Sequence, residues 1–577
     1  MAATTKPIPP PPPLPSLLDK LHRQTLIVDV DSWILRSPVC AFSYFMLVAV
    51  EAGGFLRGLL LLLLYPLLCL LGVGDDGARA ARAMATVALV GLEENEVARV
   101  GRAVLPKFFL EAAAAEGVAA VSAAARVVAV SATFPRVMVD AFLREYVGVD
   151  TVVGVEVRSV GGFLAGLVDD EDAAEMAAKR LRGLFGDELE VVAGKKKELS
   201  GNGGAVGLVG AASSGRVHYL FSPYYCKHIN KEHIVKGHFK NINKDGICSC
   251  SLKTTYFSTC PAPMNITYNV HPFSVWMQET FAVSEADTRG WRPLPRESYP
   301  RPLIFHDGRL AFLPTPSAAL AMYTFLPFAV ALVAFRTVAF SFLPYRLCFP
   351  VGAFTGMHYR LVAGHVPLAA GAGEEGRLYV CNHRTLLDPI IVAAALRRPV
   401  TAVTYSLSPV SELIAPIRTA RLTRDRAKDQ RNMASLLARG DLVVCPEGTT
   451  CREEYLLRLS PLFAELGADV NPVALDTRVG MFYGTSTKPG AKWMDPFYFM
   501  MNPRPAYRVE FLPSAAAAAS ERGDDSIEVA NRVQRELGRA LGFELTGLTR
   551  KDKYMTLAGN EGVVMPAAPK ERHGRRD

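Results

Sequence analysis

Hydrophobic residues in this chain are grouped into short runs that end in polar turns. The runs are rich in valine, leucine and isoleucine, which is typical of strands buried on both faces of a parallel sheet. They predict strands at Leu26–Val30, Arg126–Val130, Leu378–Cys381, Leu442–Cys445, Val470–Leu475 and Ala506–Leu512. Asp525 and Glu528 have the spacing of a capping box for a helix that ends at Gly542. The pattern therefore predicts two α/β domains, one in each half of the chain.

Two longer apolar stretches predict contact with a membrane. Residues 39–74 are interrupted by only two charged residues, and residues 318–335 contain none, which reaches the lower length limit for a spanning helix. Three arginines follow the second stretch: Arg336, Arg346 and Arg360. By the positive-inside rule these arginines place the following domain in the cytosol. A buried core helix is the alternative for both stretches, so the number of crossings stays open.

Composition agrees with a membrane-associated protein of several domains. The chain has 577 residues, of which 50% are hydrophobic and 21% are charged. The net charge of +8 is too diffuse to indicate nucleic-acid binding, although it suits an anionic lipid or a phosphorylated substrate. The ten cysteines lack the paired spacing of a zinc site, and reduced thiols in a cytosol-facing protein are expected.

Residues 228–278 differ sharply in composition from both flanks. They contain no arginine, but five each of asparagine, lysine and isoleucine. Three histidines, His228, His233 and His238, are each five residues apart, which does not place them on one helical face, and no metal site is predicted. Removing residues 228–278 would join Lys227 directly to Glu279, without the abrupt change in composition at either end. We therefore predict a retained intron that is not part of the working protein, with a disordered insertion as the alternative.

The strongest chemical motif is the segment Cys381–Pro389, with the sequence CNHRTLLDP. His383 follows the predicted strand, and Asp388 precedes an apolar helix. An imidazole in this place can take a proton from a substrate hydroxyl, and a carboxylate near its other nitrogen can orient it. Asp388 followed by a proline is also an ordinary helix cap, and both roles are compatible.

Two further motifs follow in order along the chain. Arg421–Arg426 has the sequence RLTRDR, and Cys445–Thr450 has the sequence CPEGTT. Gly448 and Thr449 offer backbone and hydroxyl donors at the end of a strand, and Arg424 adds a positive charge. Such groups are suited to binding a phosphate dianion. The ordered combination of the three motifs is much harder to explain by chance than any one of them.

These motifs resemble the blocks of the PlsC-type glycerolipid acyltransferases. NHRTLLDP, RLTRDR, VVCPEGTTCREEYLLRLSPLF and NPVAL match the four blocks in order, and the resemblance covers Leu303–Gly542. The segment PLIFHDGRLAFLPTP is similar to the land-plant glycerol-3-phosphate acyltransferases in particular. The resemblance implies that His383 is the general base and that Asp388 orients it.

The same resemblance implies how substrates are bound. Residues matching Arg424, Glu447 and Gly448 hold the acceptor's phosphate, and Thr449 is a candidate neighbour; Arg421 and Arg426 are less favoured than Arg424. The acyl donor would be acyl-CoA as a co-substrate, with no cofactor and no metal. The acceptor hydroxyl would attack the thioester directly, without a covalent enzyme intermediate.

The N-terminal domain resembles the haloacid dehalogenase-like phosphatase domain of the plant members. Asp29 and Asp31 stand where that family places its nucleophile and general acid, and Ser131 or Thr133 follows the next strand. The match departs at Gly210–Ser214, which occupies the place of a metal-binding loop but has no carboxylate.

Loss of phosphatase activity follows from this departure. Phosphoryl transfer to an aspartate needs a magnesium ion held by carboxylates. Trp33 also stands where the family has a small residue. The resemblance with these departures implies a degenerate phosphatase motif, so that the product keeps its phosphate.

The predicted organisation contains two domains and several connecting segments. They are a disordered proline-rich arm at 1–20, a haloacid dehalogenase-like domain at 21–227 including the membrane segment 39–74, the insertion 228–278, a transmembrane helix at 318–335, a PlsC-like acyltransferase domain at 350–545 and a tail at 546–577. The resemblance implies a glycerol-3-phosphate acyltransferase of the endoplasmic reticulum that makes lysophosphatidic acid, acts at the sn-2 hydroxyl and serves cutin or suberin synthesis. A lysophosphatidate acyltransferase and a catalytically idle membrane scaffold are the alternatives.

Overall fold

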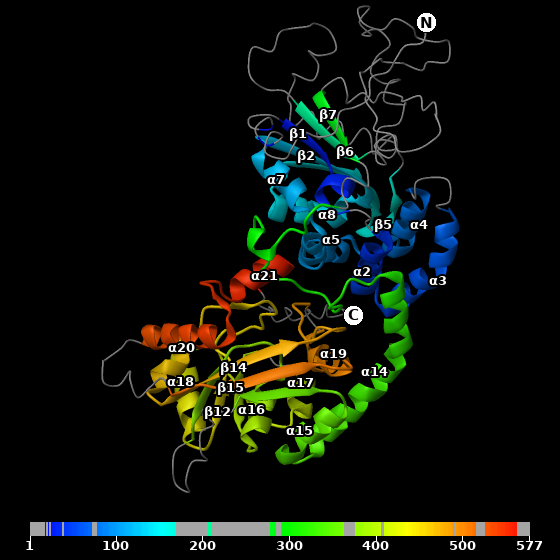
Figure 1. Cartoon of the computed structure of the whole chain (residues 1–577). Helices are drawn as coiled ribbons and strands as arrows, with labels where there is room; N and C mark the ends of the chain where they lie inside the picture. The colour runs from blue at the N-terminus through cyan, green and yellow to red at the C-terminus, as the bar shows by residue number, and fades with distance from the viewer. Residues whose placement is uncertain are drawn as a thin grey trace, which may run out of the picture. The chain divides into compact units, whose positions relative to one another are not determined.

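The computed structural model in Figure 1 describes a large part of the chain. The described residues are 18, 21, 25–36, 40–71, 78–168, 205–210, 277–283, 290–362, 376–405, 409–488, 491–514 and 526–561. The chain forms two compact units, Met1–Leu303 with Leu313–Leu320, and Ile304–Phe312 with Ala321–Asp577. The predictions for the arm 1–20 and the insertion 228–278 fall almost wholly outside the described residues. Of the insertion, only Met277 and Gln278 are described, at the start of a strand.

The first unit is built on a five-stranded parallel sheet in the order β3-β2-β1-β6-β7. The strands are β1 (Thr25–Asp29), β2 (Arg126–Pro135), β3 (Thr151–Val155), β6 (Ala205–Gly210) and β7 (Met277–Val283). Both strands predicted in this half are confirmed, and Asp29 of β1 pairs with Val130 of β2. The carboxyl end of β1 therefore lies beside that of β2, where the predicted phosphatase residues follow.

Most of the described sequence between these strands forms helices. They are α2 (Ala41–Gly53), α3 (Phe55–Leu71), α4 (Ala78–Leu89), α5 (Glu94–Ala103), α6 (Leu105–Ala112), α7 (Ala115–Ala123) and α8 (Arg136–Ala141), and β4 (Val157–Val160) forms an antiparallel hairpin with β5 (Phe163–Leu167). The core is aromatic, because Phe109 stacks on Tyr44 with ring centroids 4.5 Å apart. The Phe134 ring of β2 meets the same Phe109 edge-on at 5.4 Å.

The predicted membrane segment 39–74 is a helical hairpin in the structure. Gly54 has φ 84°, a conformation that suits glycine, and it separates α2 from α3. Phe42 and Tyr65, from the two helices, have ring centroids 4.4 Å apart. Most of α2 is buried within the first unit, as expected for the alternative of a core helix, and contact of this half with a membrane stays a prediction.

Helix α3 differs from α2 in exposing an apolar stripe. Five leucines are exposed on it at helical spacing: Leu56, Leu60, Leu63, Leu67 and Leu70. The two helices are 13 and 17 residues long, and both are shorter than the roughly 20 residues that span a bilayer. The hairpin therefore leaves β1 and β2 in one sheet on one side of any membrane.

The second unit contains a seven-stranded sheet in the order β11-β10-β12-β9-β14-β15-β8. Its strands are β8 (His358–Val362), β9 (Leu378–Cys381), β10 (Thr401–Thr404), β11 (Arg418–Arg421), β12 (Leu442–Val444), β14 (Val470–Arg478) and β15 (Ala506–Phe511). All neighbours are parallel except β14 and β15, which are antiparallel. The four strands predicted in this half are confirmed. The central strand β9 has β12 on one side and β14 on the other.

The helices of the second unit pack on this sheet. They are α15 (Tyr345–Phe354), α16 (Asp388–Leu396), α17 (Pro409–Ile414), α18 (Arg426–Leu437), α19 (Asp495–Met501), α20 (Ser526–Leu541) and α21 (Arg550–Ala558). Helix α20 buries Ala530, Val533 and Leu537, three and four residues apart, in the core on this side of the sheet. It ends before Gly542, as predicted, where φ is 74°. The capping residue Asp525 lies outside the described residues.

The structure corrects the prediction that residues from 546 onward are a tail. The short strand β16 (Glu544–Leu545) pairs with β13 (Tyr455–Leu456), and helix α21 follows it with a capping box formed by Thr549 and Asp552. Lys553 of this helix is 5% exposed and donates to Thr450. The second unit therefore extends through α21, because these residues bury polar and apolar groups against it.

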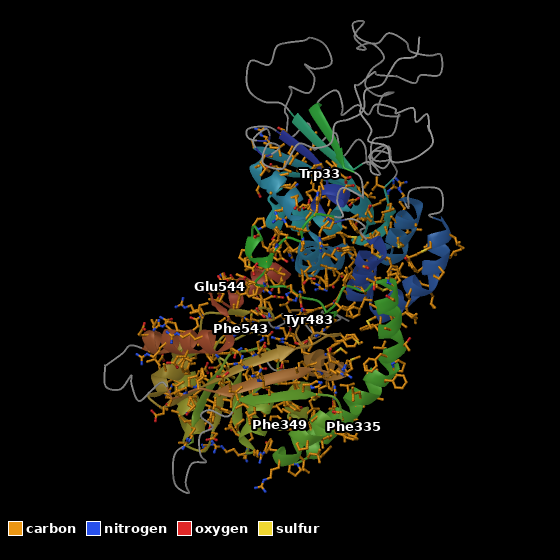
Figure 2. The ribbon with its side chains drawn as sticks, in the orientation of Figure 1. Trp33, Phe335, Phe349, Tyr483, Phe543 and Glu544 are labelled. Atoms are coloured by element: carbon orange, nitrogen blue, oxygen red, sulfur yellow. The ribbon has the colours of Figure 1, made fainter. Side chains whose placement is uncertain are left out.

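Helix α14 (Pro316–Phe342) is longer than the predicted 318–335, and within the described residues it alone has the length and apolarity to cross a membrane. Phe335, labelled in Figure 2, is 53% exposed on it. Arg336, expected to be a flanking surface charge, is fully buried instead. Its guanidinium donates to the carbonyls of Met500 at 2.5 Å and Asn502 at 2.7 Å, which fixes α14 to the end of α19.

Candidate active site

The site lies at the carboxyl end of the central strand β9. His383 follows this strand, and its Nδ1 lies 2.9 Å from Oδ2 of Asp388, the first residue of α16. Asp388 is fully buried, so its carboxylate needs hydrogen-bond donors. The hydrogen bond to Asp388 gives Nδ1 the proton and leaves the lone pair on Nε2, as a general base requires.

Asp388 holds the loop before its helix. Its Oδ2 also accepts from the backbone N–H of Arg384 at 2.6 Å and of Thr385 at 2.9 Å. Its Oδ1 accepts from the Tyr507 hydroxyl at 3.0 Å. The prediction that Asp388 caps α16 is therefore wrong: the carboxylate bonds to amides that precede the helix, and it aligns the His383 loop instead.

Glu447 is bonded to the backbone of the catalytic loop. It is 4% exposed, and its two carboxylate oxygens accept from the backbone N–H of His383 at 2.6 Å and of Leu457 at 3.0 Å. A carboxylate engaged in this way would also repel a phosphate dianion. Burial raises its pKa to about 7, against the opposing effect of these two hydrogen bonds. Glu447 therefore positions the catalytic loop, and its role in holding the acceptor's phosphate stays a prediction.

The thiol of Cys445 is the other polar neighbour of His383. Cys445 follows strand β12, and its Sγ lies 3.4 Å from Sγ of Cys381 on β9. Burial opposes the charged form of His383, but the hydrogen bond to the Asp388 carboxylate favours it, and the pKa of His383 is raised well above 6.5. The contact with Cys381 and burial raise the pKa of Cys445 well above 9, so Cys445 is a neutral thiol at neutral pH.

A cavity of about 250 Å³ opens at His383. Gly448 and Thr449 line it on one side, and apolar side chains line most of the rest: Phe340, Leu386, Ile390, Ile414, Phe497 and Met500. Phe340 belongs to α14, so the long apolar helix forms part of the wall. The cavity combines a general base with a predominantly apolar surface, which suits a substrate with a hydrocarbon chain.

Arg424 lines a neighbouring groove that shares Gly448 with this cavity. Its backbone has φ 71°, a left-handed conformation that is uncommon outside glycine. The Asp429 carboxylate holds this turn, because it accepts from the N–H of Thr423 at 2.7 Å and of Arg424 at 2.8 Å. The strained turn presents the Arg424 guanidinium at the groove.

The other two arginines of the same motif are paired elsewhere. Arg421 forms an ion pair with Glu412 at 2.9 Å, and Arg426 forms one with Glu465. Among the described residues Arg424 has no carboxylate partner within ion-pair distance. Of the predicted phosphate-binding residues, Arg424, Gly448 and Thr449 therefore reach the cavity or its groove, whereas Glu447 does not.

In the first unit, Asp29 and Asp31 lie at the carboxyl end of β1 and are buried. Asp31 accepts from the Ser131 hydroxyl at 3.3 Å and from the Thr133 N–H at 3.0 Å, so β2 supplies both predicted neighbours. The two oxygens of Asp29 accept from the Asp31 N–H at 3.1 Å and the Ser32 hydroxyl at 2.8 Å. Residues 211–214 of the predicted metal loop lie outside the described residues.

Several residues that shape the catalytic site were not predicted from the sequence. Asn382, next to His383, is fully buried and exchanges two hydrogen bonds of 2.8 Å with the backbone of Leu475 on β14. The Arg384 guanidinium donates to the Cys451 carbonyl at 2.8 Å and lies 5.0 Å from the Phe543 ring, which is labelled in Figure 2. Asn382 and Arg384 are the sequence neighbours of His383, so their polar character beside the predicted base was a signal that could have found them. Tyr507, more than a hundred residues away, carried none.

The fold and the site together define a two-domain acyltransferase. Family models agree with both halves: residues 25–232 match "Glycerol-3-phosphate acyltransferase RAM2-like, HAD-like domain", and residues 362–476 match "Acyltransferase". The α/β class predicted for each domain is confirmed.

Similar proteins span nearly the whole chain. It is 41% identical over 553 residues to probable glycerol-3-phosphate acyltransferase 2 of Arabidopsis thaliana, which covers 94% of this chain and 91% of that protein. It is also 41% identical to glycerol-3-phosphate acyltransferase 1 of Arabidopsis thaliana, covering 94% and 83%. Glycerol-3-phosphate acyltransferase RAM2 of Petunia hybrida is 35% identical, covering 91% and 95%. The chain belongs to the plant glycerol-3-phosphate acyltransferase family.

Proposed function

We propose that this chain transfers an acyl group from acyl-CoA to a hydroxyl of glycerol-3-phosphate. The observation that carries the proposal is the His383–Asp388 pair, with a hydrogen bond of 2.9 Å that leaves Nε2 available beside an apolar cavity. Arg424 and Gly448 lie next to that cavity and supply a cation and a backbone donor for the phosphate. The names of the relatives agree with this acceptor.

The reaction needs both substrates in the site at once. The acceptor hydroxyl attacks the thioester carbonyl while His383 takes its proton, so that a C–O bond forms and the C–S bond breaks. The proton then passes from the imidazolium to the departing CoA thiolate. Asp388 stabilises the imidazolium between these events, because its carboxylate is buried and hydrogen-bonded in place.

The acyl chain occupies the apolar part of the cavity in this proposal. Thr337, Phe340 and Ser341 of α14 form part of the wall. Because the same helix has the length and apolarity to cross a membrane, the wall joins a surface suited to lipid. We place the enzyme on the endoplasmic reticulum membrane, with the acyltransferase domain in the cytosol, where acyl-CoA is available.

A comparison of acceptors tests the proposal. Purified protein in detergent or liposomes is given one acyl-CoA with either glycerol-3-phosphate or lysophosphatidic acid, and products are separated by mass spectrometry. We expect the specificity constant for glycerol-3-phosphate to exceed that for lysophosphatidic acid by at least about tenfold. A preference for lysophosphatidic acid would contradict the proposal. It would indicate a lysophosphatidate acyltransferase instead.

The N-terminal domain is expected to leave the product's phosphate in place. Both oxygens of Asp29 accept protein hydrogen bonds, and Gly210–Ser214 supplies no carboxylate for magnesium. Incubation with glycerol-3-phosphate, acyl-CoA and magnesium should therefore release no monoacylglycerol above the level of a protein-free control. Monoacylglycerol that accumulates with wild-type protein and disappears with Asp29→Asn would show an active phosphatase.

A further inference from the structure

The segment that leads into helix α21 is hydrogen-bonded to strand β13 and the residues after it, about 90 residues earlier in the chain. The Thr546 N–H donates to the Leu456 carbonyl at 2.9 Å, and the Leu548 carbonyl accepts from the Arg458 N–H at 2.9 Å. These bonds continue the pairing of β16 with β13. The capping box of Thr549 and Asp552 then starts the helix. The first residue of α21 is Arg550. The backbone hydrogen bonds just before the helix therefore set its position.

A buried lysine fixes the same helix to the Glu-Gly-Thr-Thr turn. The Lys553 Nζ donates to the Thr450 hydroxyl at 3.2 Å and also to the Thr450 carbonyl. Burial lowers the pKa of Lys553 to about 8. Because Thr450 is two residues from Gly448, the turn and α21 hold a common position, and Arg550 is placed one helical turn or less from the anchoring lysine.

Arg550 lines both the main cavity at His383 and the groove that contains Arg424. It shares this double position with Tyr405, Gly448, Ser460 and Leu462. Its guanidinium lies 4.7 Å from the centre of the Tyr554 ring, which supports the side chain from one turn further along the helix. Arg550 is thus a cation at the junction of the cavity and the groove. The cavity contains the general base His383, and the groove contains Arg424.

The charges at the junction favour a phosphate dianion. Arg424, Arg426 and Arg550 line the groove, and Arg426 is paired with Glu465. Among the described residues that line the groove, Asp429 is the one carboxylate; it is 1% exposed and accepts from the N–H groups of its own turn. Two guanidinium groups on separate elements can bind two different pairs of phosphate oxygens, which one cannot do.

We propose that Arg550 binds the phosphate of the acceptor together with Arg424, and that it thereby selects glycerol-3-phosphate and sets the distance from phosphate to the attacking hydroxyl. The proposal rests on the function proposed above. It assigns a substrate-binding role to a residue that lies beyond the matched acyltransferase segment 362–476. The phosphate lies in the groove, and the glycerol carbons extend past Gly448 toward His383.

Steady-state kinetics of Arg550→Ala tests this assignment. We expect the KM for glycerol-3-phosphate to rise about 10- to 100-fold, as for loss of a charged hydrogen-bonding partner, while the KM for acyl-CoA changes less than about twofold. Inorganic phosphate should inhibit the wild type competitively against glycerol-3-phosphate, and its inhibition constant should rise by a similar factor in the variant. Arg550→Lys, which keeps the charge without the planar fork, should give an intermediate KM.

Lys551→Ala is the matched control. Lys551 is the next residue of the same helix, its side chain is 64% exposed, and it pairs with Glu561 at 2.7 Å. Its loss removes the same formal charge away from the groove, so the KM for glycerol-3-phosphate should change less than about twofold. Thermal unfolding of both variants separates binding from folding, and Arg550→Lys replaces Arg550→Ala if the latter does not fold.

The outcomes separate this inference from the function on which it rests. If Arg424→Ala raises the KM for glycerol-3-phosphate and Arg550→Ala does not, the role of Arg550 is overturned and the function stands. If Arg550→Ala raises only the KM for acyl-CoA, Arg550 binds the donor and the inference is also overturned. If the wild type acylates no glycerol-3-phosphate at all, the proposed function itself fails.

Discussion

Replacement of His383 by alanine should reduce acyl transfer on the order of 100- to 10,000-fold, the usual contribution of a general base. The imidazole lines the cavity, and its Nδ1 is bonded to Asp388 at 2.9 Å, which leaves Nε2 as the basic nitrogen. The loss should appear mainly in kcat, because the side chain acts on the proton in the transition state. The measurement is initial-rate kinetics with glycerol-3-phosphate and one acyl-CoA.

His358→Ala provides a control for this variant. His358 starts β8 at the edge of the same sheet and is exposed. Its removal should leave kcat within about twofold of the wild type. Near-normal turnover in a folded His383→Ala protein would contradict the mechanism, and it would favour a catalytically idle scaffold or another base.

Replacement of Asp388 by asparagine should reduce kcat by up to about 10,000-fold, the loss seen when the orienting carboxylate of a Ser–His–Asp triad is replaced. The variant keeps the volume of a fully buried side chain, and its amide oxygen can still accept from the Arg384 N–H. It removes the negative charge that stabilises the imidazolium. It also removes the acceptor that holds the Nδ1 tautomer, since the amide can present its NH2 group instead.

The pH dependence gives this variant a second readout. Only neutral His383 can act as a base, so activity should rise with pH through its pKa, which the structure places well above 6.5. Without the Asp388 carboxylate, burial lowers the pKa of His383, and the rise in residual activity should move to lower pH. A pH profile that stays in place would show that Asp388 does not control the imidazole. Thermal unfolding would show whether the loop it holds has collapsed.

The chemistry of the site could be predicted from the sequence where it depends on neighbouring residues. The runs around Val380 and Val443 marked two buried strands, and the polar groups directly after them had to meet at one edge of the sheet. The spacing of His383 and Asp388 allowed one loop to join them. Local sequence was enough because each of these contacts spans only a few residues or one strand pair.

The predictions that needed correction depend on long-range contacts. The sequence marked Arg336 as a flanking charge, but carbonyls of Met500 and Asn502 bind its guanidinium from more than 160 residues away. Glu447 stands beside Gly448 in the sequence, and its oxygens also accept from the backbone amides of His383 and Leu457, which no local pattern indicated. No local pattern reports which distant donor will meet a buried polar group.

The most direct test of the proposed acyl transfer is the ratio of free CoA to acylated glycerophosphate formed in one reaction. Purified protein is incubated with acyl-CoA, magnesium and glycerol-3-phosphate, and free CoA and acylated glycerophosphate are measured together over time. The account predicts one lysophosphatidic acid for each CoA released, with neither formed by the His383→Ala protein above background. CoA release without lysophosphatidic acid, or equal rates in the two proteins, would contradict it.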